Sequence, residues 1–323
     1  MPALPLEIRS QKIIILCRDV GGYIERLSDY LGSANTVTFI DVLADRRDFG
    51  FLPGKLRGVV RRYLQVRSAL KAIHQAGQVD SLLVVNPGQI DPRLVNSAMK
   101  AAKLRVAYLC DGIDRLGMPV AQLASFDKVY TFDAADAQAY GLRKITNYIY
   151  EQRTGLPVSA QYKAFVVMSG KHRVPVLSRL AQQFAKCGQC NVLFLVQSKP
   201  VEGAHEGITF FRERKSLEDV AELVRRSEIL IDIVRPGHTG LSFRFFEAML
   251  YGKKIITNNA TVQNYDFYNA SNVLVIDSEN PVIPKVFVDG EYQPVPTEVL
   301  QRYTMAAWAN EVFAPTGVPY EPR

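Results

Sequence analysis

The sequence has little cysteine, and this excludes a disulfide-based fold. Its 323 residues contain four cysteines, too few for a disulfide framework and typical of a protein in a reducing compartment. Cys187 and Cys190 have the spacing of a redox or zinc motif, but no second pair of ligands follows at a comparable spacing. We therefore interpret them as ordinary thiols at the end of a helix.

The sequence also lacks a long hydrophobic run. No apolar stretch approaches the roughly 18 to 20 residues that a membrane-spanning helix needs. The first apolar run, Ile13–Leu16, is short and follows a polar segment, so it does not resemble the core of a signal peptide. We therefore expect a cytoplasmic protein.

What the sequence does contain is an alternation of short apolar runs and helix-like stretches. This alternation is typical of parallel α/β sheets. In the first half the expected strands are Ile13–Leu16, Val37–Val42, Ser81–Val85, Arg105–Leu109, Lys128–Phe132 and Ile145–Tyr150. In the second half they are Ala164–Met168, Asn191–Val196, Ile208–Phe211, Ile229–Ile233, Lys254–Thr257 and Val273–Ile276.

Two similar sets of strands predict two α/β domains, a division that suits the length of the chain. They meet in the polar stretch Glu151–Tyr162, so we expect domains at 1–155 and 156–313. A last helix is expected from Thr297 to Phe313. Residues 314–323 are polar and rich in proline, and we interpret them as a tail.

The net charge of +7 is concentrated in one segment, Arg46–Lys71, which carries the whole excess. Apolar residues recur there at helical spacing, and Phe49, Phe51 and Leu52 precede them. A basic amphipathic helix of this kind binds an anionic membrane surface; a solvated helix face and a nucleic-acid contact are the alternatives. The arginines that we assign to a membrane or acceptor surface are Arg57, Arg61, Arg62 and Arg67.

The densest candidate for chemistry is the segment from Asp232 to Gly252. It predicts a strand end, a loop with two glycines, and a helix from Gly240 to Tyr251. Backbone N–H groups at such a helix start bind a diphosphate, and Glu247 could accept hydrogen bonds from ribose hydroxyls. The side chains that could add charge or hydrogen bonds to the phosphates are Arg235, Thr239, Ser242 and Arg244.

Three passages of the chain resemble bacterial glycosyltransferases of the GT-B fold that assemble lipopolysaccharide and capsule. The passages are Tyr108–Arg115 with Phe126–Asp136, Gly240–Glu247 with Gly252–Asn259, and Tyr265–Asp277. The resemblance implies two Rossmann-like domains facing across a cleft, with the C-terminal helix returning to the N-terminal domain. It also implies that the N-terminal domain binds the acceptor and the C-terminal domain binds the nucleotide-sugar.

The resemblance further implies a donor site in the C-terminal domain. Glu247 would bind the ribose, the segment from Thr239 through Gly240 to Ser242 the phosphates, and His238 would contact the donor. Gly170, Lys171 and Arg173, which follow the first strand of this domain, would stabilise the leaving diphosphate. The chain departs from the retaining pattern of two glutamates, because Thr239 occupies the place of the first. It contains no Asp-x-Asp pair, so we expect neither a metal nor another cofactor.

Transfer with inversion needs a base for the acceptor hydroxyl. We assign this role to Asp111, which directly follows an apolar strand, with Asp19 as the second choice. The alternative for both is a carboxylate that caps the next helix.

The resulting hypothesis is a metal-independent hexosyltransferase that adds a sugar to a glycan or lipid-linked glycan, at the inner face of the membrane and without a nucleic-acid partner. A nucleotide-sugar epimerase and a non-catalytic sugar-binding or nucleotide-binding protein are the alternatives.

Overall fold

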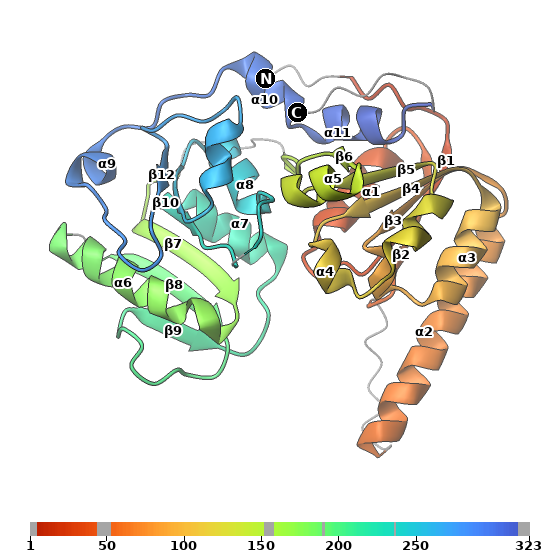
Figure 1. The fold of residues 1–323 in the computed structure, drawn as a ribbon, viewed down its shortest axis with the longest axis horizontal. Coiled ribbons are helices and arrows are strands. Elements are labelled where there is room, and N and C mark those ends of the chain that lie inside the picture. Colours follow the sequence, from red (N-terminus) through yellow and green to blue (C-terminus); the bar gives the residue numbers. More distant parts are fainter. Residues whose placement is uncertain (1–4, 44–52, 152–157, 189–190, 236, 316–323) are drawn as a thin grey trace. The chain divides into compact units, whose positions relative to one another are not determined.

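Two six-stranded parallel sheets organise the chain (Figure 1). The computed structural model describes residues 5–43, 53–151, 158–188, 191–235 and 237–315. By its contacts the chain divides into an N-terminal unit, Pro2–Thr146 with Thr304–Arg323, and a C-terminal unit, Asn147–Tyr303. The division at Thr146 precedes the predicted domain boundary at 155/156. That predicted boundary borders residues 152–157, which lie outside the described part of the chain, as do Cys190, Phe49, Phe51 and Leu52.

The sheet of the N-terminal unit has the strand order β2-β1-β3-β4-β5-β6. All its neighbouring strands pair in parallel. The strands are β1 (Lys12–Cys17), β2 (Thr36–Asp41), β3 (Val79–Val85), β4 (Ala102–Leu109), β5 (Lys128–Thr131) and β6 (Arg143–Lys144). Because the strands are parallel, their carboxyl ends meet at one edge, where ligands of open α/β sheets bind.

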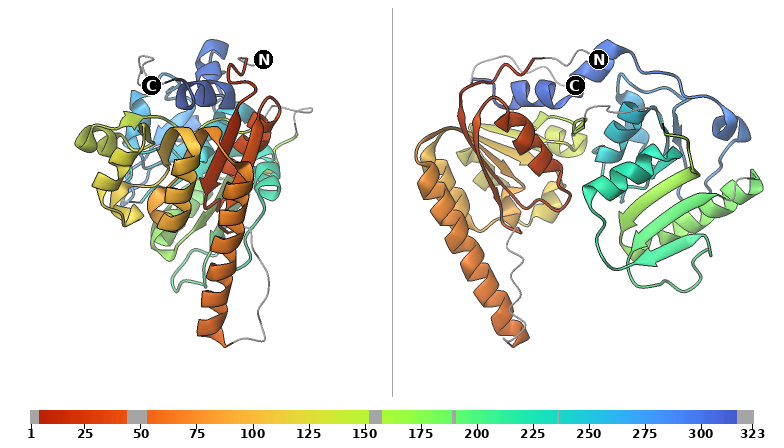
Figure 2. Two further views of the ribbon diagram at one scale, coloured as in Figure 1. Left: turned by 90° about the vertical axis from the view of Figure 1, so that its right-hand side faces the viewer. Right: turned by 180° about the vertical axis from the view of Figure 1, so that it is seen from behind.

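Helices cover both faces of this sheet. Ile14 and Leu16 pack with α2 and α3 in one core cluster, so the alternating residues Ile13 and Ile15 point to the opposite face. The helices are α1 (Tyr23–Gly32), α2 (Gly54–Ala76), α3 (Pro92–Ala101), α4 (Ile113–Leu116) and α5 (Ala134–Tyr140), with 3-10 turns η1 (Pro87–Gln89) and η2 (Val120–Ser125). Figure 2 shows that α2 extends well beyond the sheet of its own unit.

The C-terminal helix returns to the N-terminal unit, as predicted. The ring of Trp308 on α11 (Met305–Val312) lies 5.2 Å from that of Tyr108 on β4, edge to face. The ammonium of Lys128 donates to the carbonyl of Ala314 at 2.6 Å. The single helix predicted from Thr297 to Phe313 is wrong: α10 (Thr297–Arg302) ends before Tyr303, and Thr304 caps α11 as a separate helix.

The sheet of the C-terminal unit has the strand order β12-β11-β10-β7-β8-β9 and is also parallel throughout. The strands are β7 (Tyr162–Ser169), β8 (Val192–Gln197), β9 (Ile208–Phe211), β10 (Ser227–Asp232), β11 (Lys254–Thr257) and β12 (Val273–Val275). The six runs predicted for this half match these strands to within a few residues. The apolar runs alone therefore located this sheet.

Two core clusters lie on the two faces of this sheet. One face packs with α6 and α9, and the other with α7 and α8. The helices are α6 (Val174–Lys186), α7 (Leu217–Arg225), α8 (Phe243–Tyr251) and α9 (Lys285–Asp289), with 3-10 turns η3 (Lys171–Arg173) and η4 (Ala260–Asn264). α8 begins later than predicted because Ser242, not Gly240, is its N-cap; it ends as predicted, with Gly252 in the left-handed conformation.

The strand predicted at Ile145–Tyr150 is wrong. Only Arg143–Lys144 pairs with β5, and the following residues leave the sheet. The rings of Tyr148 and Tyr150 instead lie 5.2 and 6.0 Å from that of Phe243. The aromatic residues of this run are buried against α8, which produces the same apolar pattern as a strand.

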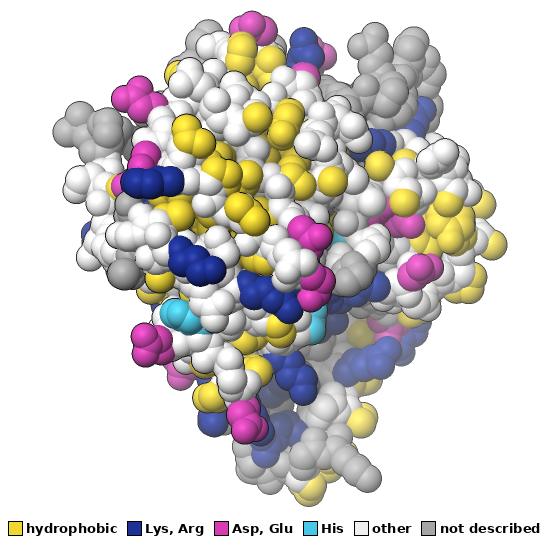
Figure 3. Space-filling model, turned by 60° about the vertical axis from the view of Figure 1, so that its left-hand side comes forward, with side chains coloured by type: hydrophobic (Ala, Val, Ile, Leu, Met, Phe, Trp, Pro, Cys, Tyr) yellow, Lys and Arg dark blue, Asp and Glu magenta, His cyan; other side chains and the backbone are white. Residues whose placement is uncertain are grey.

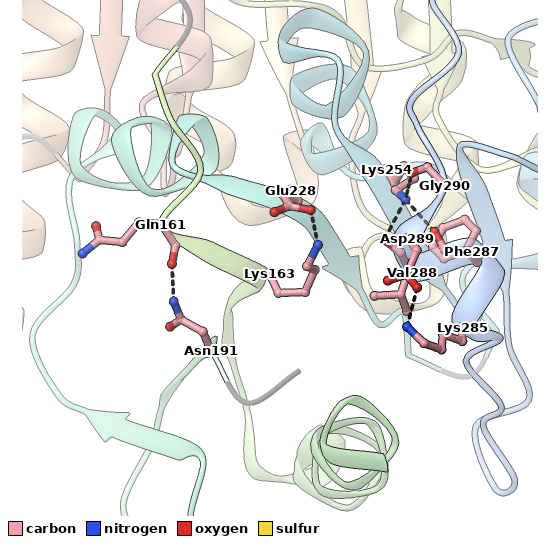
Figure 4. Close-up of polar contacts among 10 residues, drawn as sticks. All are labelled: Gln161, Lys163, Asn191, Glu228, Lys254, Lys285, Phe287, Val288, Asp289 and Gly290. Atoms are coloured by element: carbon pink, nitrogen blue, oxygen red, sulfur yellow. Dashed lines mark hydrogen bonds and ion pairs between the residues drawn. The ribbon is translucent and has the colours of Figure 1, made fainter. Parts of the chain in front are cut away.

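The amino ends of the strands in the C-terminal unit are held by buried and interstrand polar contacts (Figure 4). The buried ammonium of Lys254 donates to the carbonyls of Phe287, at 2.5 Å, Val288 and Gly290 at the end of α9. Lys163 on β7 pairs with Glu228 on β10. The ammonium groups of Lys163 and Lys254 at this edge are therefore paired within the unit.

The exposed side of α9 carries Val286 beside the ion pair of Lys285 and Asp289, and the exposed Val282 precedes the helix. Val282 and Val286 are 66% and 80% exposed, and Figure 3 shows hydrophobic side chains gathered on this side of the unit. Phe287 and Val288 point the other way, into the core. Ligands of open parallel sheets bind at the carboxyl ends of the strands, so we expect the polar candidate site at that edge.

Candidate active site

The carboxyl ends of β7 and β10, which are neighbours in the sheet, carry most of the predicted donor-binding residues. The loop after β7 contributes Gly170–Arg173, and the segment after β10 contributes Arg235 to Ser242. The structure thus brings together on one edge of the C-terminal unit Gly170, Lys171, Arg173, Arg235, His238, Thr239, Gly240 and Ser242.

The loop after β7 is cationic and begins with a glycine in an unusual conformation. Gly170 has φ of +94°, a region that side-chain-bearing residues rarely adopt. Neither η3 nor α6 has a side-chain cap at its start, and Lys171 is exposed. Desolvation, Arg173 and Arg235 together lower the pKa of His172. Positive charge from both loops therefore gathers at an uncapped helix start.

Arg173 holds this arrangement together. Its guanidinium donates to the carbonyl of Ile233 at 3.0 Å and to that of Ser169. These carbonyls stand at the carboxyl ends of β10 and β7. Arg173 therefore fixes the two loops relative to each other, and part of its hydrogen-bonding capacity is already used.

Asp232, at the end of β10, contacts the start of α8; the sequence analysis did not assign this carboxylate to the site. Ser242 Oγ accepts from the N–H of Arg244 at 3.2 Å and donates to Asp232 Oδ1 at 2.7 Å. The other oxygen of Asp232 is buried and has no hydrogen-bond partner in the described part of the chain. Burial raises the pKa of Asp232. Its position at the end of an apolar strand could have indicated this residue from the sequence.

The loop before α8 is held by residues that follow β11. Asn259 Nδ2 donates to the carbonyls of Thr239 at 3.2 Å and Gly240 at 3.3 Å, and Thr261 Oγ1 donates to that of Thr239 at 2.7 Å. Asn258 exchanges hydrogen bonds with the backbone of Val234. The sequence analysis did not assign these side chains, although an Asn-Asn pair directly after an apolar strand marks the same edge.

Arg244 and Glu247 lie apart from this edge, inside the unit. Glu247 is 1% exposed, accepts from Tyr150 Oη at 2.5 Å and pairs with Arg244. The guanidinium of Arg244 lies 5.6 Å from the centre of the Phe165 ring. Burial raises the pKa of Glu247, and the charge of Arg244 opposes that rise. Both oxygens of Glu247 are thus bonded within the protein.

In the N-terminal unit, Asp19 is a helix cap. Its Oδ1 accepts from the N–H groups of Gly21 at 3.0 Å and Gly22 at 2.7 Å, and its Oδ2 from those of Ile24 at 3.1 Å and Glu25 at 2.8 Å. These amides form the start of α1. The geometry therefore favours Asp19 as a helix-capping carboxylate over Asp19 as the catalytic base.

Asp111 forms an ion pair on its own segment. The N–H of Ile113 at the start of α4 is bonded by Asp136 at 2.9 Å. Asp111 pairs instead with the exposed Arg115 at 2.8 Å, and its side chain is 20% exposed. Asp111 is thus a partly exposed carboxylate at the carboxyl end of a central strand, the edge where ligands of open α/β sheets bind.

A hollow of about 830 Å³ opens in the N-terminal unit. Arg18 after β1, Arg62 on α2, the η1 turn, α3 and the segment 117–126 line it. Gly88 permits the close approach of two of these walls, because a Cβ there would lie 2.4 Å from the carbonyl oxygen of Leu116. The hollow is therefore built from the fold of this unit alone.

The predicted basic helix exists as α2. Leu56, Val59 and Tyr63 form an exposed apolar stripe along its first turns, with Val59 65% exposed. The four predicted arginines lie on this helix; Arg62 and Arg67 are exposed, and Arg57 and Arg61 are partly buried. No helix among the described residues has the length and hydropathy to cross a bilayer.

The part of the chain that the structure describes contains no group of three or more His, Cys, Asp or Glu side chains that could hold a metal ion. The expectation of metal independence stays a prediction, to be tested by chelation.

No protein-family model matches the chain, and no curated protein matches it. Solved structures do. The chain is similar to an alpha-glucosyltransferase in complex with UDP-glucose and DNA containing an abasic site, with 10% identity and a TM-score of 0.56 over 94% of this chain and 95% of that chain. An alpha-glucosyltransferase in complex with UDP and a mismatched 13-mer DNA gives 11% identity and a TM-score of 0.56, over 84% and 87%.

The chain is also similar to HepE of Anabaena in complex with UDP and glucose. The identity is 13% and the TM-score 0.50, over 94% of this chain and 96% of that chain. At such identities the likeness shows the fold. The chain therefore has two Rossmann-like units, as GT-B glycosyltransferases have, and the predicted fold class is confirmed.

Proposed function

We propose that the protein is a glycosyltransferase that uses a nucleotide-sugar as donor. The observation that carries this proposal is the cationic, uncapped helix start at the carboxyl edge of the C-terminal unit. Helix N-termini attract phosphate through their unbonded N–H groups and the helix dipole. The likeness to enzymes solved with UDP or UDP-glucose supports the same assignment.

The donor diphosphate binds between the loop after β7 and the start of α8. Lys171 supplies an exposed charge, and the backbone from Thr239 to Ser242 supplies hydrogen-bond donors. Arg173 and the Asn259 side chain keep the two loops in place, while Arg244 and Glu247 support α8 from inside. Asp111 of the N-terminal unit is the base that removes the proton from the acceptor hydroxyl.

The acceptor is a growing surface glycan of the lipopolysaccharide, O-antigen or capsule type, and the transferred group is a hexose. The resemblance of Gly240–Asn259 and Tyr108–Asp136 to enzymes of that class supports this choice. The alpha-glucosyltransferase structures contain DNA, so a DNA duplex is included as an acceptor in the test.

Donor binding is tested by thermal shift with UDP, GDP, CMP and their sugar conjugates, because a ligand selective for the folded state stabilises it by mass action. Lys171→Gln should weaken nucleotide binding by about 1 to 3 kcal/mol, as expected when a charge-assisted hydrogen bond is lost. Lys186→Gln, at the far end of α6, is the matched control and should leave binding unchanged.

Incubation with labelled nucleotide-sugars then separates the possible activities. Transfer to a glycan supports the proposal; an isomerised donor would identify an epimerase, and binding without turnover a non-catalytic protein. Transfer to DNA and not to a glycan would show that the acceptor is DNA rather than a surface glycan. Transfer should persist in EDTA, and loss that manganese or magnesium restores would overturn the metal-independent mechanism.

We further propose that α2 places the enzyme on the inner face of the plasma membrane. Each surface Lys or Arg near an anionic leaflet contributes about 1 kcal/mol, and the stripe of Leu56, Val59 and Tyr63 adds apolar contact. Co-sedimentation with anionic vesicles should decrease in salt and after replacement of Arg57, Arg61, Arg62 and Arg67 by glutamine. Equal recovery with neutral vesicles would leave α2 as a solvated helix.

A further inference from the structure

The described lining of the hollow in the N-terminal unit carries an excess of positive charge. The lining contains two arginines and one carboxylate, Asp91. Asp91 is bonded through both oxygens by Arg93, at 3.0 Å each, and lies 3.5 Å from Arg62, and these contacts lower its pKa to about 2. The guanidinium of Arg18 has no hydrogen-bond or ion-pair partner among the described residues.

The same hollow presents uncommitted amide groups. The side chains of Gln89, Asn96 and Gln122 line it from three different segments, and within the described chain none of them is bonded to another protein group. Each amide offers two donors and an acceptor, which is the capacity that pairs with the hydroxyl groups of a sugar.

The remaining wall is apolar and adaptable. Met99 and Met118 line the hollow and pack on the core cluster beneath it. Methionine side chains fit irregular surfaces, and here they offer contact area to the C–H faces of a ring.

From this combination we propose that the hollow binds the acceptor, and that the acceptor sugar carries a negative charge that Arg18 recognises. The inference rests on the proposed function and adds the substrate class. The charged group is a carboxylate or a phosphate ester, because both match the planar donors of an arginine. A purely apolar chain would leave the three amides unpaired, and a neutral sugar would leave the guanidinium unpaired.

The inference is tested by titrating the full chain, without nucleotide, with 4-nitrophenyl glycosides that share one aglycone. The acidic probes are the glucuronide, the galacturonide and the glucoside 6-phosphate, and the neutral controls are the glucoside and the galactoside. At least one acidic probe should bind about tenfold more tightly than its neutral parent, the scale of one charge-assisted contact. The carboxylate and phosphate probes distinguish the two sources of charge.

Arg18→Gln should remove this preference and leave the affinity for the neutral parent unchanged, whereas Arg18→Lys should retain part of it. Lys100→Gln, an exposed charge of the same unit outside the hollow, is the control. Equal binding of all acidic and neutral pairs, a preference that survives in Arg18→Gln, or tighter binding of farnesyl phosphate than of every glycoside would overturn the inference. UDP binding is measured on the same proteins, so that failure of the proposed function is seen separately.

Discussion

The first loops of the two units differ in the charge that they place at the start of the following helix. In both units the first strand ends at the carboxyl edge and a short loop leads into a helix. In the N-terminal unit the N–H groups at the start of α1 donate hydrogen bonds to the carboxylate of Asp19. In the C-terminal unit the corresponding helix start has no side-chain cap and is preceded by Lys171 and Arg173.

The difference indicates which unit takes an anionic ligand at its first loop. A helix N-terminus carries a partial positive charge that an anion stabilises. At the start of α1 the protein supplies that anion itself, through Asp19. At the start of α6 it supplies Lys171 and Arg173 instead. The comparison therefore supports the proposal that the C-terminal unit binds the donor and the N-terminal unit the acceptor.

The largest expected effect is on turnover, from Asp111→Asn. A general base contributes about 10²- to 10⁴-fold to the rate, and we expect transfer to fall by that factor. Donor binding should stay nearly intact, because the base acts on the acceptor in the transition state. The measurements are the turnover number and the dissociation constant for UDP.

Asp114→Asn is the matched control, since Asp114 is an exposed carboxylate of the same segment. It should leave turnover unchanged. A decrease of less than about tenfold in Asp111→Asn would place proton abstraction elsewhere and would weaken the division of labour between the units.

The next effect is on stability, from Glu247→Ala. Its partner Arg244 would remain buried without its carboxylate, and breaking a buried pair in this way costs about 3 to 5 kcal/mol. Urea unfolding measures the loss. Replacing both partners, Arg244→Met with Glu247→Leu, should recover most of it, because no buried charge is then left unpaired.

The same variant tests the predicted ribose contact of Glu247. If folded Glu247→Ala loses nucleotide affinity by about 1 to 3 kcal/mol while its unfolding free energy is unchanged, Glu247 binds the donor directly. A structural role of Glu247 thus predicts lower stability, whereas a direct ribose contact predicts lower nucleotide affinity at unchanged stability.

Most of the fold follows from local pattern. Runs such as Ile208–Phe211 and Lys254–Thr257 coincide with strands, because buried parallel strands are continuous apolar runs between helices. The sequence pattern gave wrong predictions where tertiary packing determines the local structure. Tyr148 and Tyr150 are buried against α8, and Thr304 interrupts the last helix by capping α11.

The sequence placed the candidate residues on one edge of the sheet, but it could not distinguish their roles. The rule that ligands bind at the carboxyl edge of a parallel sheet placed Lys171, Thr239 and Ser242 together. It could not show that Glu247 is turned into the core, because helix position alone does not reveal a partner as distant in sequence as Tyr150. Nor could it predict the hollow beside Arg18, because the segments that line it, among them α2 and residues 117–126, are far apart in the sequence.

The smallest effect, and the most direct test of the comparison, comes from Asp19. Because Asp19 accepts four backbone hydrogen bonds at the start of α1, Asp19→Ala should lower the unfolding free energy by about 1 to 2 kcal/mol, the upper range for loss of a helix cap. Asp29→Ala, an exposed carboxylate further along α1, is the control and should have little effect. UDP affinity should be unchanged in both variants, since we propose that the donor binds in the other unit. If Asp19→Asn abolished transfer at unchanged stability, Asp19 would be the base rather than a cap, and the first loops of the two units would no longer differ in the way proposed.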